Sequence, residues 1–92
     1  MPRYAKRVDA NQKGIIRALK AVGCSVVHLS QGSGIPDLLV GWRQQSFLLE
    51  VKNPDGFNKV LDTQKEFARD WRGPPPIVVR SSDDALKAIG AI

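Results

Sequence analysis

The strongest constraint on the fold is a pair of apolar segments that only a few residues separate. Residues 37–42 read DLLVGW, residues 46–52 read SFLLEVK, and the three residues 43–45 connect them. Short segments rich in Leu, Val and Phe are typical of strands. Parallel strands need a crossover of about a dozen residues or more, so a connection this short predicts an antiparallel hairpin. No Gly or Asn, the residues that favour tight hairpin turns, stands at its tip.

Three charged residues lie in this otherwise apolar hairpin, namely Asp37, Glu50 and Lys52. Because strand side chains alternate between faces, Glu50 and Lys52 share one face of their strand. A two-residue turn at residues 43–44 places Asp37 opposite Glu50. A turn shifted by one residue, or a four-residue loop over 43–46, places Asp37 opposite Lys52 and diagonal to Glu50. All three registers bring the charged side chains together, and only a one-residue slip or a bulge separates them.

The residue types in this group point to a particular chemistry. Two carboxylates with no imidazole or thiolate partner suit a hard cation such as Mg²⁺ or Mn²⁺. A lysine beside such an ion can orient an attacking water or offset the charge that develops on a phosphate, as metal-assisted phosphodiester hydrolysis requires. A Glu-x-Lys sequence on an exposed strand is commonly just a solvated pair. Here apolar residues flank it, and burying unpaired charge is costly.

The remaining elements are predicted from capping residues, periodicity and turn residues. A helix begins at Asp9, which forms a capping-box pair with Gln12, and ends at Gly23. Residues 24–29 (CSVVHL) are predicted as a strand and residues 31–36 as a loop.

A second helix follows the loop over residues 53–59, with Thr63 and Glu66 spaced as a capping box. Its inward face is predicted to hold Gln64, Phe67, Ala68 and Trp71. Residues 76–80 are predicted as a strand, and Ser81 or Ser82 caps a last short helix. The predicted order is helix, three strands, helix, strand, helix. This order indicates an α/β fold with a small mixed four-stranded sheet flanked by helices.

Length and charge limit the classes of protein that the chain can represent. The 92 residues suffice for one domain, for which association into a homodimer would add stability. Fourteen Lys and Arg against nine Asp and Glu give a net charge of +5, which favours a polyanionic partner such as DNA but also suits a merely soluble basic surface. Residues 1–8 are predicted as a basic N-terminal arm.

The single Cys24 excludes an internal disulfide and a Cys-rich zinc site, and a buried structural thiol is the expected role. No membrane-spanning segment or signal peptide is recognised, so an intracellular location is expected: the cytoplasm, or the host cytoplasm if the chain is phage-encoded.

Residues 34–37 (GIPD), followed thirteen positions after Asp37 by Glu50-Val51-Lys52, resemble the motif of PD-(D/E)xK nucleases. The segments GIPDLLVG and LEVK, with Gln64 in the next helix, resemble the VRR-NUC branch of that superfamily, small nucleases found in phages and in repair proteins. The similarity covers roughly residues 9–88, and its overall plan is also similar to archaeal Holliday-junction resolvases.

The resemblance implies a restriction-endonuclease-like core and a role for each matching residue. Asp37, Glu50 and the Val51 carbonyl would be ligands of Mg²⁺ or Mn²⁺. Lys52 would be the catalytic lysine, and Gln64 matches the glutamine that such domains carry on the helix after the motif.

Two further residues are candidates for accessory roles. Gln12 stands where family members often carry a Glu, so one metal ligand would be weaker here. Ser33 lies in the glycine-containing loop before Asp37, which could contact DNA.

The function predicted from these features is a metal-dependent DNA endonuclease. A chain with no room for a separate sequence-reading domain is expected to recognise DNA structure, such as a four-way junction cut by a homodimer. The alternative is a non-catalytic module that retains the nuclease fold and binds nucleic acid or a partner, and a structural subunit of a larger assembly is a third reading.

Overall fold

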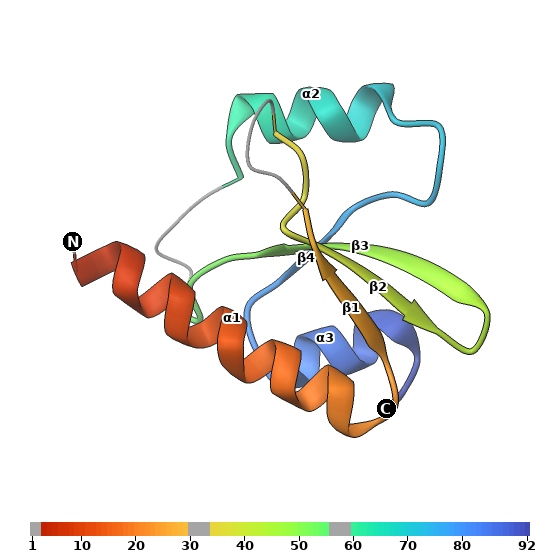
Figure 1. The fold of residues 1–92 in the computed structure, drawn as a ribbon. Helices are drawn as coiled ribbons and strands as arrows, with labels where there is room; N and C mark the ends of the chain where they lie inside the picture. The colour runs from red at the N-terminus through yellow and green to blue at the C-terminus, as the bar shows by residue number, and fades with distance from the viewer. Residues whose placement is uncertain (1–2, 30–33, 56–59) are drawn as a thin grey trace.

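The computed structural model describes residues 3–29, 34–55 and 60–92, with residues 3–9 described by their backbone alone. Within these ranges the elements follow one another in the predicted order (Figure 1). They are α1 (Arg3–Ala21), β1 (Ser25–His28), β2 (Leu38–Trp42), β3 (Gln45–Val51), α2 (Asp62–Asp70), β4 (Ile77–Val79) and α3 (Ser82–Ile89). None of the described helices is long and apolar enough to cross a membrane.

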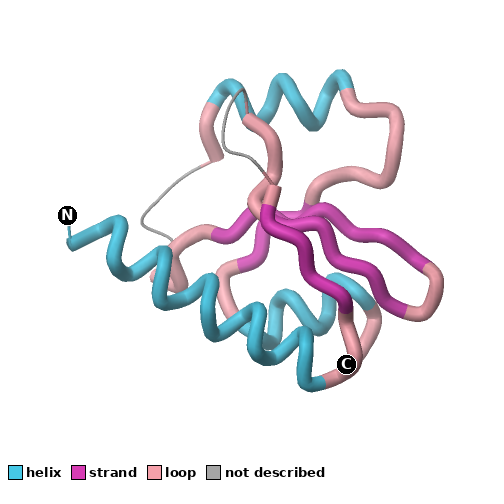
Figure 2. Tube along the Cα trace, in the orientation of Figure 1, coloured by secondary structure: helices cyan, strands magenta, loops and turns pink. Residues whose placement is uncertain are grey.

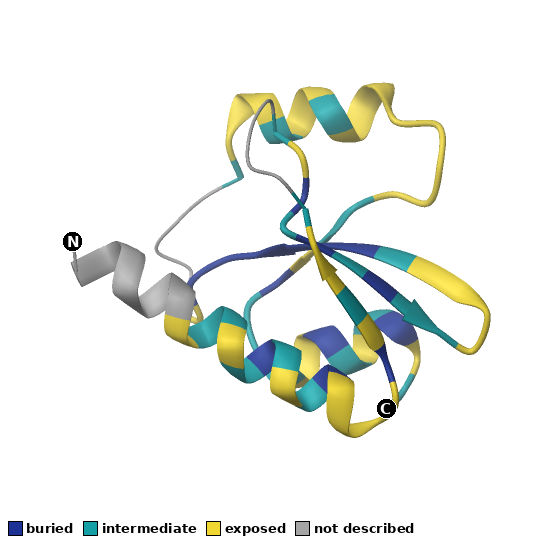
Figure 3. Cartoon of the chain, viewed as in Figure 1, coloured by how far each residue is buried: buried dark blue, intermediate teal, exposed yellow. Residues whose placement is uncertain are grey.

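The four strands form one mixed sheet in the order β1-β2-β3-β4, with antiparallel pairing except between β3 and β4, which are parallel. Helices α1 and α3 pack side by side on one face, and α2 lies across the other (Figures 1 and 2). The core lies between the sheet and the α1–α3 pair (Figure 3). Its fully buried members include Ile15, Leu19, Leu38, Val40, Leu49 and Val79.

The first helix begins earlier than predicted and ends where predicted. It starts at Arg3, so the predicted cap at Asp9 is wrong, and residues 3–8 of the predicted arm are helical. No Gly or Pro between residues 3 and 9 stops the helix from extending. At the other end Gly23 has a φ of 99°, Cys24 N–H donates to the Leu19 carbonyl at 3.1 Å, and Gly23 N–H donates to the Lys20 carbonyl at 3.0 Å. These two hydrogen bonds define a Schellman cap.

The hairpin adopts the first of the three predicted registers. Trp42 pairs with Gln45 across a two-residue turn at Arg43 and Gln44, whose φ angles of 49° and 67° are both left-handed. Such a turn matches the twist of the flanking strands. A left-handed non-glycine residue costs about 1–2 kcal/mol. The Arg43 guanidinium lies 4.3 Å from the centroid of the Trp42 ring, a contact that offsets about 0.5–1 kcal/mol of that cost.

Helix α2 departs from its predicted packing. Leu61, not Thr63, is its N-cap, and Leu61 N–H donates to Gln64 Oε1 at 2.9 Å. Ala68 is exposed, so the predicted inward face is wrong for this residue. Trp71 faces the sheet, where it lines a pocket with Leu39 and Leu48, but it is not packed into the core and remains 45% exposed. The sheet face beneath α2 carries Asp37 and Glu50 next to Leu39 and Leu48. An apolar pocket, rather than a close-packed layer, lies between α2 and this face.

The last helix is capped as predicted. Ser81 is its N-cap, and its hydroxyl accepts a hydrogen bond from Asp84 N–H at 3.0 Å. The Asp84 carboxylate accepts one from Arg80 N–H at 2.9 Å. Cys24 is buried, as predicted, and burial raises the pKa of its thiol.

Candidate active site

The structure brings the two carboxyl groups of the hairpin together. Leu38 pairs with Leu49, so one step further along the strands Asp37 stands opposite Glu50. Residues that are directly opposed in antiparallel strands point to the same face. The carboxyl groups of Asp37 and Glu50 share a hydrogen bond, and Glu50 is only 6% exposed. This is the face that α2 spans rather than the face that forms the core.

The surroundings of Glu50 favour its protonated form. Burial, then the hydrogen bond with Asp37 and the negative charge of Asp37, raise the pKa of Glu50 from 4.5 to about 8. The charge of Lys52 acts in the opposite direction without cancelling the rise. Glu50 therefore keeps its proton at pH 7 when no cation is present. Two carboxyl groups held this close need a proton or a cation between them.

Pro36 and Asp37 together determine how the main chain of Val51 is paired. In the observed register Pro36 stands opposite Val51. Asp37 Oδ2 accepts the Val51 N–H at 2.8 Å, which shows that the main-chain groups of Val51 point toward β2. Pro36 has no N–H with which to pair the Val51 carbonyl in the ladder. Pro36 therefore donates no hydrogen bond to the Val51 carbonyl.

The side chain of Lys52 is held by a residue of α2. Lys52 is 5% exposed, and its Nζ donates to Gln64 Oε1 at 2.8 Å. The same oxygen accepts the Leu61 N–H, so a single amide caps the helix and positions the ammonium group. An ammonium group has three N–H donors. The bond to Gln64 leaves two of them for other partners.

Asn11 is a site-supporting residue that the sequence prediction missed. Its Nδ2 donates to the Lys52 carbonyl at 2.8 Å and to the Arg80 carbonyl at 3.0 Å, which ties α1 to the ends of β3 and β4. Asn11 lies four and eight residues before Ile15 and Leu19, both fully buried. A polar residue in line with a buried helical stripe is the signal that could have identified it.

The two accessory candidates fare differently. Gln12 is half-buried, and among the described residues its side chain makes no hydrogen bond with Asp37 or Glu50. Ser33 lies outside the described residues.

Gly34 allows the segment that carries Asp37 to approach α2. Its φ is 76°, and a Cβ at this position would overlap the Thr63 carbonyl group and lie 2.7 Å from the Gln64 backbone nitrogen. The first residue of the GIPD segment therefore touches the helix turn that holds Lys52. This contact explains why a glycine is required there on two grounds, its backbone angle and the lack of space.

Replacing Gly34 with Ala should destabilise the protein more than replacing Gly90 with Ala. Gly90 has a φ of 85°, but a Cβ there meets no atom within 4 Å. Each substitution costs about 1–2 kcal/mol for the left-handed backbone. The overlap with α2 should add about 1–3 kcal/mol at Gly34, by analogy with overpacking. Urea unfolding of both variants measures the difference, and equal losses would contradict the close-approach argument.

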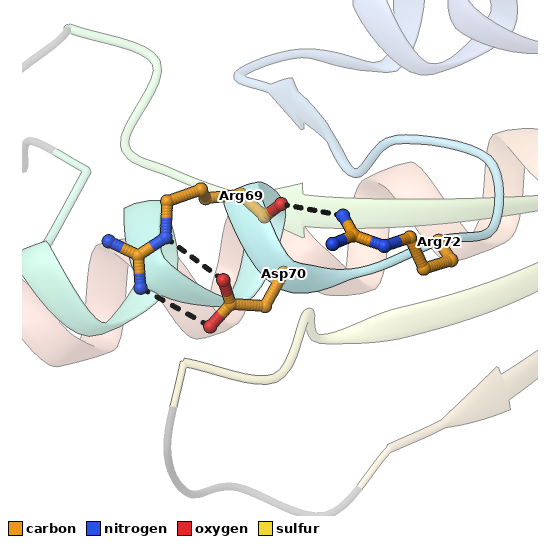
Figure 4. Close-up of polar contacts among 3 residues, drawn as sticks. All are labelled: Arg69, Asp70 and Arg72. Carbon is orange, nitrogen blue, oxygen red and sulfur yellow. Dashed lines mark hydrogen bonds and ion pairs between the residues drawn. The ribbon is translucent and has the colours of Figure 1, made fainter.

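The far end of α2 holds an ion pair that takes no part in the site (Figure 4). Arg69 Nε and Asp70 Oδ1 lie 2.9 Å apart, and both side chains are 70% exposed. The Arg69 carbonyl accepts a hydrogen bond from Arg72 Nη1 at 3.4 Å. The hydrogen bond with Arg69 lowers the pKa of Asp70. Exposed pairs of this kind contribute little to stability.

Within residues 10–29, 34–55 and 60–92, no group of three or more His, Cys, Asp or Glu side chains is placed to hold a metal ion. The site brings together two carboxyl groups, with the buried Lys52 two residues beyond Glu50. The fold that presents these residues is α/β, with a four-stranded mixed sheet and three helices over the described ranges.

No protein-family model matches the chain, and no match was found among curated proteins or solved structures.

Proposed function

We propose that this chain is a Mg²⁺- or Mn²⁺-dependent endonuclease that hydrolyses phosphodiester bonds in DNA. The observation that carries the proposal is the meeting of Asp37 and Glu50 on one sheet face, with the buried Lys52 two residues beyond Glu50. A merely solvated Glu-x-Lys pair would not be buried in this way. The resemblance of the same residues to the PD-(D/E)xK motif adds support, and it also suggests a restriction-endonuclease-like core.

The residues present fit a hard divalent cation. Asp37, Glu50 and the Val51 carbonyl supply oxygen atoms alone, which Mg²⁺ and Mn²⁺ prefer. Burial, then the hydrogen bond with Asp37 and its negative charge, raise the pKa of Glu50, and a bound cation would offset the repulsion between the two carboxylates. When bound, such an ion would polarise the scissile phosphate and lower the pKa of a coordinated water.

Lys52 acts next to these ligands as a positioned hydrogen-bond donor. Gln64 fixes its Nζ, and the two remaining N–H groups can donate to the attacking water or to a phosphate oxygen. Burial strengthens such charge-assisted bonds, because little water competes for them. Gln64 is thus a positioning residue for Lys52 rather than a group that reacts itself. In-line attack by water would leave a 5′-phosphate, as the superfamily resemblance implies.

Branched DNA is the proposed substrate. One domain with a net charge of +5 can bind the phosphate backbone but has little surface left to read a long base sequence. A two-fold homodimer would present two equivalent sites to the symmetric strands of a four-way junction.

Incubation with linear, flapped and four-way DNA, with and without Mg²⁺ or Mn²⁺, tests this function. We expect paired nicks across an immobile four-way junction, dependent on the cation and abolished by EDTA. Denaturing gels of end-labelled strands locate the nicks. Random cleavage of linear duplex would contradict the structural selectivity, and no cleavage of any substrate would contradict the enzyme.

The presence of only two carboxylates among the described side chains of the site keeps a second function in view. A basic module with this fold could bind nucleic acid without cutting it. Titration calorimetry with Mn²⁺ separates the two functions, because a pure binding module has no need of a cation at Asp37 and Glu50. Loss of the Mn²⁺ signal in an Asp37→Asn variant would support the nuclease.

A further inference from the structure

An apolar pocket opens on the α2 side of the sheet, and its lining includes Leu39 and Leu48, the same-face residue pair next to Asp37 and Glu50 in the hairpin. Its volume is about 330 Å³, and its lining includes Pro36, Leu39, Leu48, Phe67 and Trp71. Pro36 immediately precedes Asp37, so the chain runs directly from the pocket lining to the proposed metal site. The pocket exists because α2 stands across this face without filling it.

The pocket, the carboxyl pair and the lysine lie in a row along one strand and its continuation. Leu48, Glu50 and Lys52 are spaced two residues apart, so they project to the same face at intervals of about 7 Å. Leu39 stands opposite Leu48 as Asp37 stands opposite Glu50. A phosphate bound at Glu50 and Lys52 would therefore lie one same-face residue spacing, about 7 Å, from Leu48 in the pocket. This spacing is comparable with the distance between a phosphate and the base of the same nucleotide.

Flat aromatic and apolar groups form the walls of the pocket. The rings of Phe67 and Trp71 stack with centroids 5.5 Å apart and planes inclined by 16°. The Trp71 indole N–H donates to the Pro74 carbonyl at 3.0 Å, which fixes the ring and satisfies its polar atom. Trp71 nevertheless remains 45% exposed. A fixed, exposed indole beside an apolar pocket presents a surface on which a planar ring can stack.

We propose that this pocket holds an unpaired nucleobase next to the scissile phosphate, so that the substrate is DNA with an unstacked nucleotide at the cleavage position. The inference rests on the proposed function, because the cleavage site supplies the phosphate. A base within a duplex is paired and stacked on both sides and cannot enter, whereas a base at a branch point or in a single strand is free to do so. The basic chain and the continuity of the pocket with the phosphate position favour a nucleotide over an uncharged ligand.

Trp71 provides a direct probe of the pocket. The chain has two tryptophans, so Trp42→Phe leaves Trp71 as the sole tryptophan, which can be excited selectively over Tyr4. The full-length variant is titrated at low salt in EDTA with a short oligothymidylate and with the same oligonucleotide in which abasic residues replace the bases. We expect saturable quenching of Trp71 by the first, and binding weaker by about ten-fold or more, with no quenching, for the second.

Filling the pocket supplies a matched pair of variants. Ser46 is exposed and lines the pocket, so Ser46→Phe should occupy it without disturbing the core, as circular dichroism would verify. Ala21→Phe adds the same ring at an exposed position at the end of α1, on the other side of the sheet. We expect Ser46→Phe to lose the quenching and the preference for bases, and Ala21→Phe to retain both.

Each contrary outcome identifies which proposal fails. Equal affinity for the two oligonucleotides, or quenching that persists in Ser46→Phe, would overturn the base pocket. A further outcome would be that Ser46→Phe changes the sedimentation coefficient of the DNA-free protein, while Trp71 fluorescence does not respond to bases. The pocket would then be a contact surface for a second copy of the chain, and the proposal would likewise be overturned. Cleavage of DNA without base-dependent quenching would support the nuclease function and disprove the base pocket. Base-dependent quenching in a protein that cuts no DNA would support the base pocket and disprove the nuclease function.

Discussion

Replacing Lys52 with Ala should reduce metal-dependent DNA cleavage by a factor on the order of 10³, the middle of the range for a positioned proton donor or acceptor. The loss follows from the removal of the ammonium group that Gln64 on α2 holds near the carboxyl pair. Affinity for uncleaved DNA should change little, because many phosphate contacts contribute to it. Single-turnover cleavage in Mn²⁺ and anisotropy binding in EDTA measure the two quantities separately.

Lys65→Ala is the matched control for this prediction. Lys65 is a neighbouring lysine on α2, but its side chain is exposed. The two variants lose the same charge, so any general electrostatic effect on DNA binding appears in both. Wild-type cleavage by the Lys52→Ala variant would disprove the assigned role, whereas equal losses in both variants would indicate an effect of net charge.

Replacing Glu50 with Gln should stabilise the metal-free protein strongly at alkaline pH. The pKa of Glu50 is raised from 4.5 to about 8 in the folded protein, so the folded state binds the proton more tightly than the unfolded state. The resulting stabilisation is fully present below about pH 4.5 and is lost as the pH rises through about 8. A shift of this size corresponds to on the order of 5 kcal/mol, and the 6% exposure of Glu50 leaves little solvent screening.

Urea unfolding in EDTA between pH 4 and 9 tests this linkage. We expect the stability of the wild type to fall relative to Glu50→Gln as the pH rises, with the two proteins nearly equal at the acid end. Mn²⁺ should restore the stability of the wild type at pH 8–9 and have little effect on the stability of Glu50→Gln. Glu66→Gln is the control: it replaces an exposed carboxylate, so its stability should depend on pH in the same way as that of the wild type. Parallel curves for the wild type and Glu50→Gln would show that Glu50 ionises freely.

The local elements of the fold were predictable because their signals lie within a few residues. Gly23 and Ser81 mark a helix end and a helix start by forming hydrogen bonds with residues at most five positions away. The antiparallel hairpin follows from the length of its connection. The start of α1 was mispredicted because Asp9 is a permitted cap, and no nearby residue reveals that the helix continues past it.

The candidate site was predictable in part, for the same reason. Alternation along β3 placed Glu50 and Lys52 on one face, and every plausible hairpin register placed Asp37 near them. The sequence did not select among those registers. Two left-handed residues at the turn, Arg43 and Gln44, decide the pairing, although neither is a residue type that favours such angles.

The sequence by itself determined the order of the elements, the hairpin and the face that Asp37, Glu50 and Lys52 share. These depend on periodicity and chain connectivity, which are local. Only the tertiary structure decided that Gln64 holds Lys52, that Asn11 joins α1 to the strand ends, and that α2 leaves a pocket beside the site. These contacts join residues 12 to 69 positions apart, and their geometry depends on how whole elements pack.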